Sequence, residues 1–315
     1  MTRIDVHELT KEYGRTRAVD HLTFRVEPGR VTGFLGPNGS GKSTTMRLVL
    51  GLDRPTAGTA TIGGRAYATL RAPLRHVGAL LDAGAAHGSR SARAHLRALA
   101  VGNGIPAGRA DEVLEQVGLA RVAGDRVKTY SLGMRQRLGV AAALLGDPAV
   151  LLLDEPSNGL DPEGIAWIRE LLRDLAAGGR TVLVSSHLMN ETASFADHLV
   201  VLGRGRLLAD TSTRAFIDSR VRPRVRVRSA DGERLREVLR ARGHEAVAAE
   251  GGYWEVEGAA VEEVGAVAAD AGVAVLELTA QEGTLEEAYF DLTAEHTSHR
   301  SERESAHTTK QGTST

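Results

Sequence analysis

The clearest chemical signal in this sequence is a glycine-rich stretch with one lysine, GPNGSGKST, at residues 36–44, which contains the phosphate-binding pattern G-x-x-x-x-G-K-[ST]. Glycines let successive backbone N–H groups converge on phosphate oxygens, and a helix that begins after the loop adds positive potential. We therefore expect Lys42 to reach the β- and γ-phosphates of a nucleotide and the Ser43 hydroxyl to ligate Mg²⁺. The alternative is a chance match in a glycine-rich chain. The residues predicted to surround the phosphates are Gly36, Pro37, Asn38, Gly39, Ser40, Gly41, Lys42, Ser43 and Thr44.

Two adjacent carboxylates, Asp154 and Glu155, follow a continuous apolar run at 149–153. Such a run is typical of a central parallel strand that is covered on both faces. At the end of such a strand, both side chains can face the crevice at the carboxyl edge of the sheet. We expect Asp154 to hold the metal through water and Glu155 to polarise an attacking water. A solvated acidic turn is the alternative, and it does not explain the apolar positions immediately before the pair.

A histidine, His187, ends a third apolar run, TVLVSS, at residues 181–186. A lone histidine is more often structural. At the end of a core strand, however, it could contact a γ-phosphate or the attacking water.

The elements that must position these groups can be predicted from local pattern. Residues 31–35, VTGFL, form a short buried strand, and 44–52 have the apolar spacing of a helix. Strand, glycine loop and helix is the order that a phosphate-binding loop requires. Asp161 and Pro162 have the residue types of an N-cap and first position for a helix ending near Gly178.

Composition sets outer limits. The chain has 315 residues, enough for one large or two ordinary domains, and its hydrophobic fraction of 42% supports a sizeable core. A net charge of −1 calls for no nucleic acid or anionic lipid, and the lack of cysteine excludes disulfides and thiolate metal sites. No apolar run is long enough to span a bilayer, and the N-terminus has no signal-peptide core. We expect a soluble chain that would rely on another chain to cross a membrane.

Taken together, these motifs resemble the ATP-binding cassette (ABC) ATPases, over residues 3 to about 218. The resemblance rests on ordered elements that each have a counterpart in the family. They are Tyr13 for the aromatic that stacks on adenine, 36–44 for Walker A, 130–141 (YSLGMRQRLGVA) for the signature, 150–155 for Walker B, 157–162 for the D-loop and His187 for the switch histidine.

The resemblance implies ATP and Mg²⁺ as ligands and a head-to-tail dimer, or pseudo-dimer, of cassettes. Each ATP would lie between the P-loop of one subunit and the signature of the other. Ser131 and Gly133 would then act on the ATP of the opposite subunit, and Asp161 would couple the two sites. Without the P-loop, the stretch after Ser131 would be interpreted only as a capped amphipathic helix.

Two departures from the family pattern stand out. The second signature glycine is replaced, so that Leu132 and Met134 flank Gly133. Where the family has a glutamine that senses γ-phosphate and Mg²⁺, this chain has Asp82. We expect Asp82 to take the glutamine's role as a metal ligand, because a carboxylate binds Mg²⁺ more strongly than an amide does. It could equally repel the γ-phosphate and slow turnover, which would make the chain a regulatory module that hydrolyses ATP poorly.

The predicted fold class is α/β, a P-loop NTPase cassette followed by a small α+β domain. The cassette, 1–218, would combine a RecA-like lobe, an antiparallel β layer and a helical subdomain at about 83–147. Residues 219–293 have the pattern β-α-β-β-α-β and a final helix, which predicts a split-βαβ accessory domain. The polar segment 294–315 is predicted to be disordered.

Arginines alternate with valines at the start of this second domain, at positions 222, 224, 226 and 228. They could form a nucleic-acid face or the solvated face of an edge strand, where charge prevents edge-to-edge pairing. No aromatic residue is interleaved with them, so we favour the edge strand and expect no nucleic acid partner.

The function predicted from these motifs is the ATP-hydrolysing subunit of an ABC transporter that powers separate polytopic permease subunits at the cytoplasmic face of the membrane. Within the family, residues 51–64, the signature and the C-terminal extension most resemble bacterial multidrug and antibiotic exporters of the bacitracin- and daunorubicin-resistance type. The alternative is a non-transport ABC ATPase acting on the ribosome or DNA. Such relatives usually carry two cassettes or long coiled-coil inserts, and this chain has neither.

Overall fold

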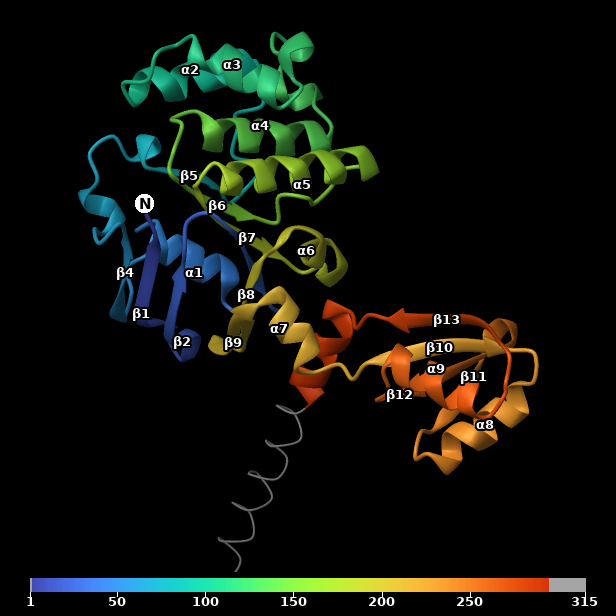
Figure 1. Cartoon of the computed structure of the whole chain (residues 1–315). Helices are drawn as coiled ribbons and strands as arrows, with labels where there is room; N and C mark the ends of the chain where they lie inside the picture. The colour runs from blue at the N-terminus through green and yellow to red at the C-terminus, as the bar shows by residue number, and fades with distance from the viewer. Residues whose placement is uncertain (1, 295–315) are drawn as a thin grey trace, which may run out of the picture. The chain divides into compact units, whose positions relative to one another are not determined.

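The computed structural model describes residues 2–294, which divide into two compact units (Figure 1). The division falls after Thr213, a few residues before the predicted boundary at 218. Residues 285–294 are helical as far as the described residues reach, and the rest of the segment predicted to be disordered lies outside them.

The core of the first unit is a six-stranded sheet in the order β5-β6-β7-β3-β8-β9. Neighbours from β5 to β8 run parallel, and β9 returns antiparallel to β8. Every residue of β3 and β7 is buried, as expected for parallel strands covered on both faces. The strands are β3 (Val31–Leu35), β5 (Val77–Leu80), β6 (Val150–Asp154), β7 (Thr181–Ser186), β8 (His198–Gly203) and β9 (Arg206–Ser212).

A second, antiparallel sheet has the order β2-β1-β4. Its strands are β1 (Ile4–Tyr13), β2 (Thr16–Val26) and β4 (Ala57–Ile62). The helix α1 (Lys42–Val49) buries Met46 in one apolar core with side chains from both sheets. Within this core the rings of Phe24 and Phe34 lie with their centroids 5.5 Å apart, which joins β2 to β3.

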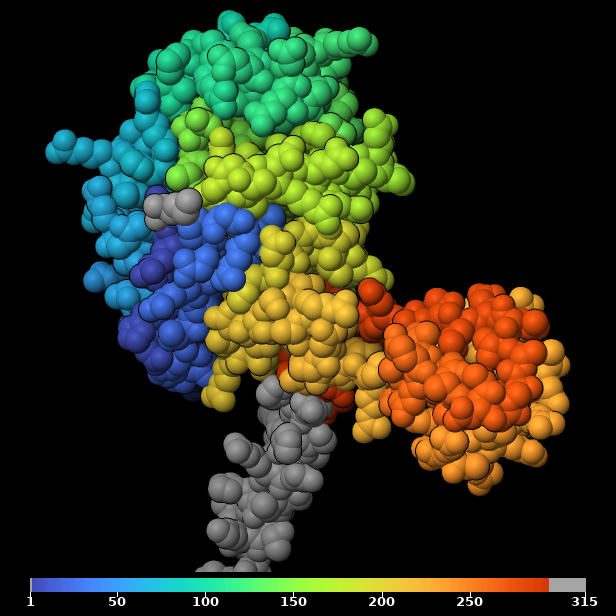
Figure 2. Space-filling view, viewed as in Figure 1, coloured from blue at the N-terminus to red at the C-terminus, as the bar shows by residue number. Residues whose placement is uncertain are grey.

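Helices α2 (Ala92–Gly102), α3 (Arg109–Gln116) and α4 (Leu132–Leu144) fall in the stretch predicted to be a helical subdomain. Figure 2 shows the α2 and α3 region as one packed surface at one end of the first unit. The helix α4 approaches β5 so closely that a Cβ at Gly78 would lie 1.9 Å from the carbonyl oxygen of Ala143. The remaining helices of this unit are α5 (Pro162–Ala177), α6 (Met189–Phe195) and the short 3₁₀ turns at Tyr67–Thr69, Pro73–Arg75, Ala120–Val122 and Val127–Thr129.

The second unit holds a four-stranded sheet in the order β11-β12-β10-β13, with every neighbouring pair antiparallel. Val225 and Val227 of β10 are buried in a core with Leu235, Leu239 and Val264 from two helices. The elements are α7 (Thr213–Asp218), β10 (Arg224–Ser229), α8 (Gly232–Ala241), β11 (Ala246–Ala249), a 3₁₀ turn (Glu250–Gly252), β12 (Tyr253–Glu257), α9 (Val261–Asp270) and β13 (Val275–Gln281).

The edge-strand explanation for the arginine stripe is wrong, because β10 lies between β12 and β13. The prediction also missed an aromatic group that pairing brings in from β12. The guanidinium carbons of Arg226 and Arg228 lie 4.0 and 5.4 Å from the ring centroid of Tyr253. Arg228 also pairs with Glu277 at 3.6 Å. Arg224, Arg226 and Arg228 thus lie on one face of a central strand, where they contact a cross-strand ring or an acidic neighbour, and Arg222 precedes the strand.

Candidate functional site

The glycine-rich loop joins the end of β3 to the start of α1, as predicted from the order strand, loop and helix. Two positions of this loop require glycine, because backbone carbonyl oxygens of other segments lie where a Cβ atom would be. A Cβ at Gly36, where φ is 153°, would lie 2.5 Å from the carbonyl oxygen of Leu202. A Cβ at Gly41, where φ is 103°, would lie 2.6 Å from the carbonyl oxygen of Ala18. Neighbouring strands therefore hold the loop in a shape that residues with side chains rarely adopt.

Lys42 bends back over the loop. Its Nζ donates to the carbonyl oxygens of Gly36 at 2.6 Å and Pro37 at 3.3 Å, and the residue is only 6% exposed. Burial lowers the pKa of the Lys42 ammonium, and the nearby carboxylates of Glu155 and Asp154 act in the opposite direction. The ammonium is thus placed inside the loop, between two backbone oxygens and two acidic groups.

A cleft of about 480 Å³ opens beside the loop. It brings together β1, β2, the loop, the start of α1 and the end of β6. Its lining residues are Tyr13, Ala18, Asn38, Gly39, Ser40, Gly41, Lys42, Ser43, Thr44, Asp154 and Glu155. The two predicted carboxylates and most of the predicted loop therefore face one space.

The carboxylates are fixed by partners that the sequence analysis missed. The Ser185 hydroxyl, at the end of β7, donates to Asp154 and accepts the backbone N–H of Glu155 at 3.0 Å. The buried Gln136 of α4 donates from Nε2 to the carbonyl oxygen of Glu155 at 2.8 Å. Glu155 itself has a φ of 50°, a left-handed conformation that costs energy in a residue other than glycine.

His187 lies next to the Glu155 carboxylate, with Nδ1 2.7 Å from Oε2. Its side chain is 46% exposed, so it is not a core histidine. The two groups come from the ends of neighbouring strands, β7 and β6. This contact joins the acid and the histidine that were selected from the sequence for water activation.

Tyr13 lies on the wall of the cleft, with 49% of the residue exposed. Its hydroxyl donates to Asp53 Oδ2 at 3.1 Å, and Lys11 Nζ lies 4.8 Å from the ring centroid. Burial, followed by the hydrogen bond to Asp53, raises the pKa of the Tyr13 hydroxyl. The ring is thus held at one end and remains open to a flat ligand.

The signature and D-loop residues do not line this cleft. Ser131 caps α4 by accepting the Met134 N–H at 3.2 Å, and Asp161 caps α5 by accepting the Gly164 N–H at 2.8 Å. A Cβ at Gly133 would lie 3.1 Å from the Gly159 carbonyl oxygen, so the signature helix begins against the D-loop of its own chain.

Asp82 also lies outside the cleft. Its Oδ1 accepts the Gly84 N–H at 2.7 Å, which closes a local turn. The residue lines a different cavity, of about 470 Å³, together with residues that include Arg47 and His95.

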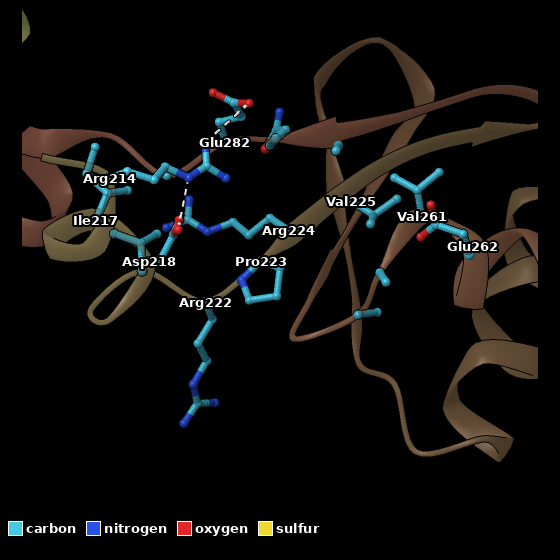
Figure 3. Close-up of a pocket in the computed structure, with 16 residues that line it drawn as sticks. Arg214, Ile217, Asp218, Arg222, Pro223, Arg224, Val225, Val261, Glu262 and Glu282 are labelled. Atoms are coloured by element: carbon cyan, nitrogen blue, oxygen red, sulfur yellow. Dashed lines mark hydrogen bonds and ion pairs between the residues drawn. The ribbon is translucent and has the colours of Figure 1, made fainter. Parts of the chain in front are cut away.

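A further cavity, of about 500 Å³, lies within the second unit (Figure 3). Its charged side chains are partly paired with one another. Arg214 contacts Asp218 at 2.9 Å and Glu282 at 3.7 Å. This cavity contains none of the residues predicted to bind nucleotide.

Comparison with known proteins identifies the family. Residues 19–158 match the ABC transporter family model. The chain is 42% identical over 212 residues to the bacitracin transport ATP-binding protein BcrA of Bacillus licheniformis, a match that covers 66% of this chain and 69% of that protein. This chain belongs to the ABC transporter ATP-binding proteins. It is therefore an ATP-binding subunit with the ATPase cassette of that family.

Two other similarities support the cassette. The daunorubicin resistance ATP-binding protein DrrA3 of Streptomyces coeruleorubidus is 40% identical over 228 residues, covering 66% of this chain and 68% of that protein. The solved structure described as the dimeric structure of MJ0796, a bacterial ABC transporter cassette, aligns with a TM-score of 0.62 at 25% identity, covering 66% of this chain and 98% of that one.

A second family model matches a later segment of the chain. Residues 223–286 of this ABC protein fit a family described only as a domain of unknown function. Within residues 2–294, no helix combines the length and apolar character needed to cross a membrane.

Proposed function

We propose that the cleft beside the glycine loop is where this cassette binds and hydrolyses ATP, with each predicted residue in its predicted role. The loop N–H groups and Lys42 bind the phosphates, and the Tyr13 ring stacks on the base. Glu155 orients or deprotonates the attacking water, and His187 positions that water and the γ-phosphate. The observation that carries the proposal is the 2.7 Å contact between His187 Nδ1 and Glu155 Oε2, next to a cleft lined by Glu155 and Lys42.

Mg²⁺ fits the oxygen donors that this cleft offers. The Ser43 hydroxyl is exposed, lines the cleft and makes no hydrogen bond within residues 2–294. Asp154 lines the same cleft, and hydroxyl and carboxylate oxygens are the hard donors that Mg²⁺ takes. When bound, the ion would neutralise phosphate charge, Ser43 would ligate it directly and Asp154 would hold it through water. Asp82 stays a predicted metal ligand, although its carboxylate lines another cavity.

We further propose that two cassettes associate head to tail. Ser131 and Gly133 begin the helix α4, whose N-terminal N–H groups would then face the γ-phosphate held by the other subunit. Asp161 would couple the two sites from the D-loop. Support comes from the neighbouring structure of MJ0796, which is described as dimeric.

The transport role follows from the same family. The relatives named for bacitracin transport and daunorubicin resistance suggest that this chain powers export of an antibiotic or another drug. It would do so from the cytoplasmic face of the membrane, bound to polytopic permease subunits. The second domain, which we assign as a split-βαβ accessory domain at about 219–293, would regulate or stabilise the cassette dimer.

Phosphate release by the purified full chain with Mg²⁺ and ATP tests the catalytic assignment. Glu155→Gln should retain ATP binding and lose turnover, because the amide cannot accept a proton from water. The matched control is Glu170→Gln, at an exposed glutamate of α5, which should turn over like the unaltered chain. Brisk hydrolysis by Glu155→Gln would overturn the assignment.

A pull-down from detergent-solubilised membranes tests the transport role. The bait is the Glu155→Gln chain with ATP and Mg²⁺. Co-purification of a polytopic membrane protein at about equal stoichiometry supports it. Capture of ribosomes or nucleic acid instead would move the function to a non-transport ATPase.

A further inference from the structure

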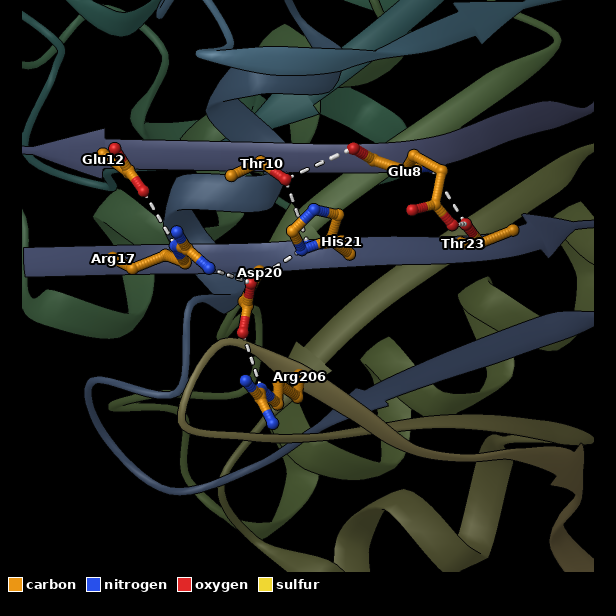
Figure 4. Close-up of polar contacts among 8 residues, drawn as sticks. All are labelled: Glu8, Thr10, Glu12, Arg17, Asp20, His21, Thr23 and Arg206. Atoms are coloured by element: carbon orange, nitrogen blue, oxygen red, sulfur yellow. Dashed lines mark hydrogen bonds and ion pairs between the residues drawn. The ribbon is translucent and has the colours of Figure 1, made fainter.

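A polar cluster centred on Asp20 is linked to the P-loop through Gly205 and contains none of the residues assigned to the nucleotide site (Figure 4). The Asp20 side chain is only 8% exposed and accepts hydrogen bonds at both carboxylate oxygens. Oδ1 contacts Arg17 at 2.9 Å and His21 Nδ1 at 2.8 Å, and Oδ2 accepts from Arg206 Nε at 2.6 Å. Arg206 belongs to β9, so the carboxylate connects two sheets of the first unit.

Asp20 owes its position to a β-bulge. The register between β1 and β2 passes from Leu9↔Leu22 to Lys11↔Val19, which leaves Asp20 and His21 in the irregular stretch. His21 has a φ of 51°, and its N–H donates to the Thr10 hydroxyl at 3.1 Å. A bulge of this kind turns a side chain away from its regular direction in the strand. Here the bulge lets Asp20 reach Arg206.

The same region is hydrogen-bonded to the glycine loop through one residue, Gly205. Its carbonyl oxygen accepts the Asp20 N–H at 2.8 Å, and its N–H donates to the Ser40 carbonyl at 2.9 Å. A Cβ on Gly205 would lie 2.8 Å from the Ala18 carbonyl oxygen. The turn between β8 and β9 is therefore packed between β2 and the P-loop, and the arginine that Asp20 holds is the next residue in the chain.

We propose that Asp20 is a positioning residue for the nucleotide site, acting through the β8–β9 turn. By holding Arg206, its carboxylate keeps Gly205 against Ser40 and so fixes the loop in its phosphate-binding shape before nucleotide arrives. The benefit is preorganisation, because ordering the loop on binding would cost affinity. This inference rests on the proposed phosphate-binding role of the loop.

The hydrogen bonds of Asp20 also extend, through Arg17, to the wall of the cleft where the base would stack. Arg17, which donates to Asp20, donates to Glu12 as well, at 2.8 Å. Glu12 precedes Tyr13, and Arg17 precedes Ala18, and both of these following residues line the cleft. One carboxylate is therefore tied to both the phosphate side and the base side of the proposed site.

Measuring nucleotide affinity and thermal unfolding on the same full-length proteins tests the inference. Asp20→Asn keeps the size of the side chain and removes its charge. We expect the Kd for Mg²⁺-ATP, measured in a Glu155→Gln background, to rise about tenfold, which corresponds to 1.4 kcal/mol. In the active chain, KM for ATP should rise by a similar factor while kcat stays within about twofold, because the loss is of ground-state binding.

Asp111→Asn is the matched control. Asp111 is also held between two arginines, Arg93 at 2.7 Å and Arg97 at 2.8 Å, but it lies in the helical layer away from the P-loop. This variant should lower the melting temperature without changing the nucleotide Kd. A cycle of Asp20→Asn and Arg206→Gln should be non-additive in nucleotide Kd, because both changes break the same contact.

Affinity within about twofold of the unaltered chain for Asp20→Asn, with only a lower melting temperature, would overturn the inference and leave the proposed site intact. If the cleft is not the ATP site, the result is different, because the unaltered chain and Lys42→Ala would then bind ATP equally poorly. If Asp20→Asn does not fold, the nucleotide Kd and the melting temperature of Arg206→Gln test the inference instead. This variant should fold, because the Arg206 side chain is 72% exposed.

Discussion

The side-chain amide of Gln136 donates to the backbone carbonyl of Glu155 over 2.8 Å, so the signature helix of this cassette is bonded to the backbone of the proposed catalytic base. Gln136 is 4% exposed, and Glu155 has a left-handed φ of 50°. A strained backbone persists only where its surroundings hold it. The hydrogen bond from Gln136 helps to hold the Glu155 backbone in this conformation. It connects the helix that would face the partner's ATP to the acid that would act on the ATP of its own subunit.

We therefore expect Gln136→Ala to lower kcat about tenfold with little change in KM, because it releases the Glu155 backbone without touching the phosphate loop. Steady-state phosphate release measures both constants. Gln116→Ala, at an exposed glutamine that ends α3, is the control. A rise in KM at constant kcat would place Gln136 in nucleotide binding instead.

Gly36→Ala should abolish nucleotide binding and lower the melting temperature. The added Cβ would lie 2.5 Å from both the Leu202 carbonyl oxygen and the Ser40 hydroxyl. Thermal unfolding and ATP binding measure the two effects. For Gly102→Ala we expect the opposite effect on stability. Gly102 is helical and a Cβ there would meet nothing within 4 Å, so the free energy of unfolding should rise by about 0.5–1 kcal/mol.

Acid should remove the contribution of Asp20 in a defined pH range. Burial raises the pKa of this carboxyl, but hydrogen bonds from His21, Arg206 and Arg17 outweigh it and lower the pKa from 3.8 to about 2. A lowered folded-state pKa gives stability that is fully present above 3.8 and is lost as the pH falls towards 2. The difference in melting temperature between the unaltered chain and Asp20→Asn should shrink as the pH falls below about 4. A difference that stays the same or grows between about pH 4 and about pH 2 would contradict a charged Asp20.

Tyr253→Ala should destabilise the second unit by about 1–2 kcal/mol, since Arg226 and Arg228 both contact the ring. Tyr253→Phe keeps the ring and loses only the 2.7 Å hydrogen bond from the hydroxyl to Glu277, so it should cost less. Denaturant unfolding gives the free energies, and the ATP Kd should stay unchanged in both variants. Equal losses would assign the stability to the hydroxyl rather than to the ring.

The sequence predicted those parts of the fold and site that depend on local pattern. The order of β3, the glycine loop and α1 follows from neighbouring residues, and so do the caps Ser131 and Asp161. These features need only helix and strand periodicity and capping chemistry, which act within a few residues.

What the sequence did not predict depends on pairing over long separations. Ser185 reaches Asp154 because β6 and β7 are adjacent, and Arg206 reaches Asp20 from a strand far along the chain. The placement of β10 inside its sheet likewise depends on which strands pair with it. A polar residue carries no local mark of a partner that lies far along the chain, so Gln136 in helix α4 and Ser185 and Asp20 in strands gave no signal of their contacts.

The arginines of β10 have a consequence for how the second unit meets charged molecules. Arg224 lies 2.9 Å from Glu287 and Arg228 lies 3.6 Å from Glu277. Oppositely charged neighbours this close cancel most of each other's potential beyond a Debye length, about 8 Å at physiological ionic strength. A polyanion diffusing towards this sheet face would therefore feel little attraction to Arg224 and Arg228 until it was almost in contact with them.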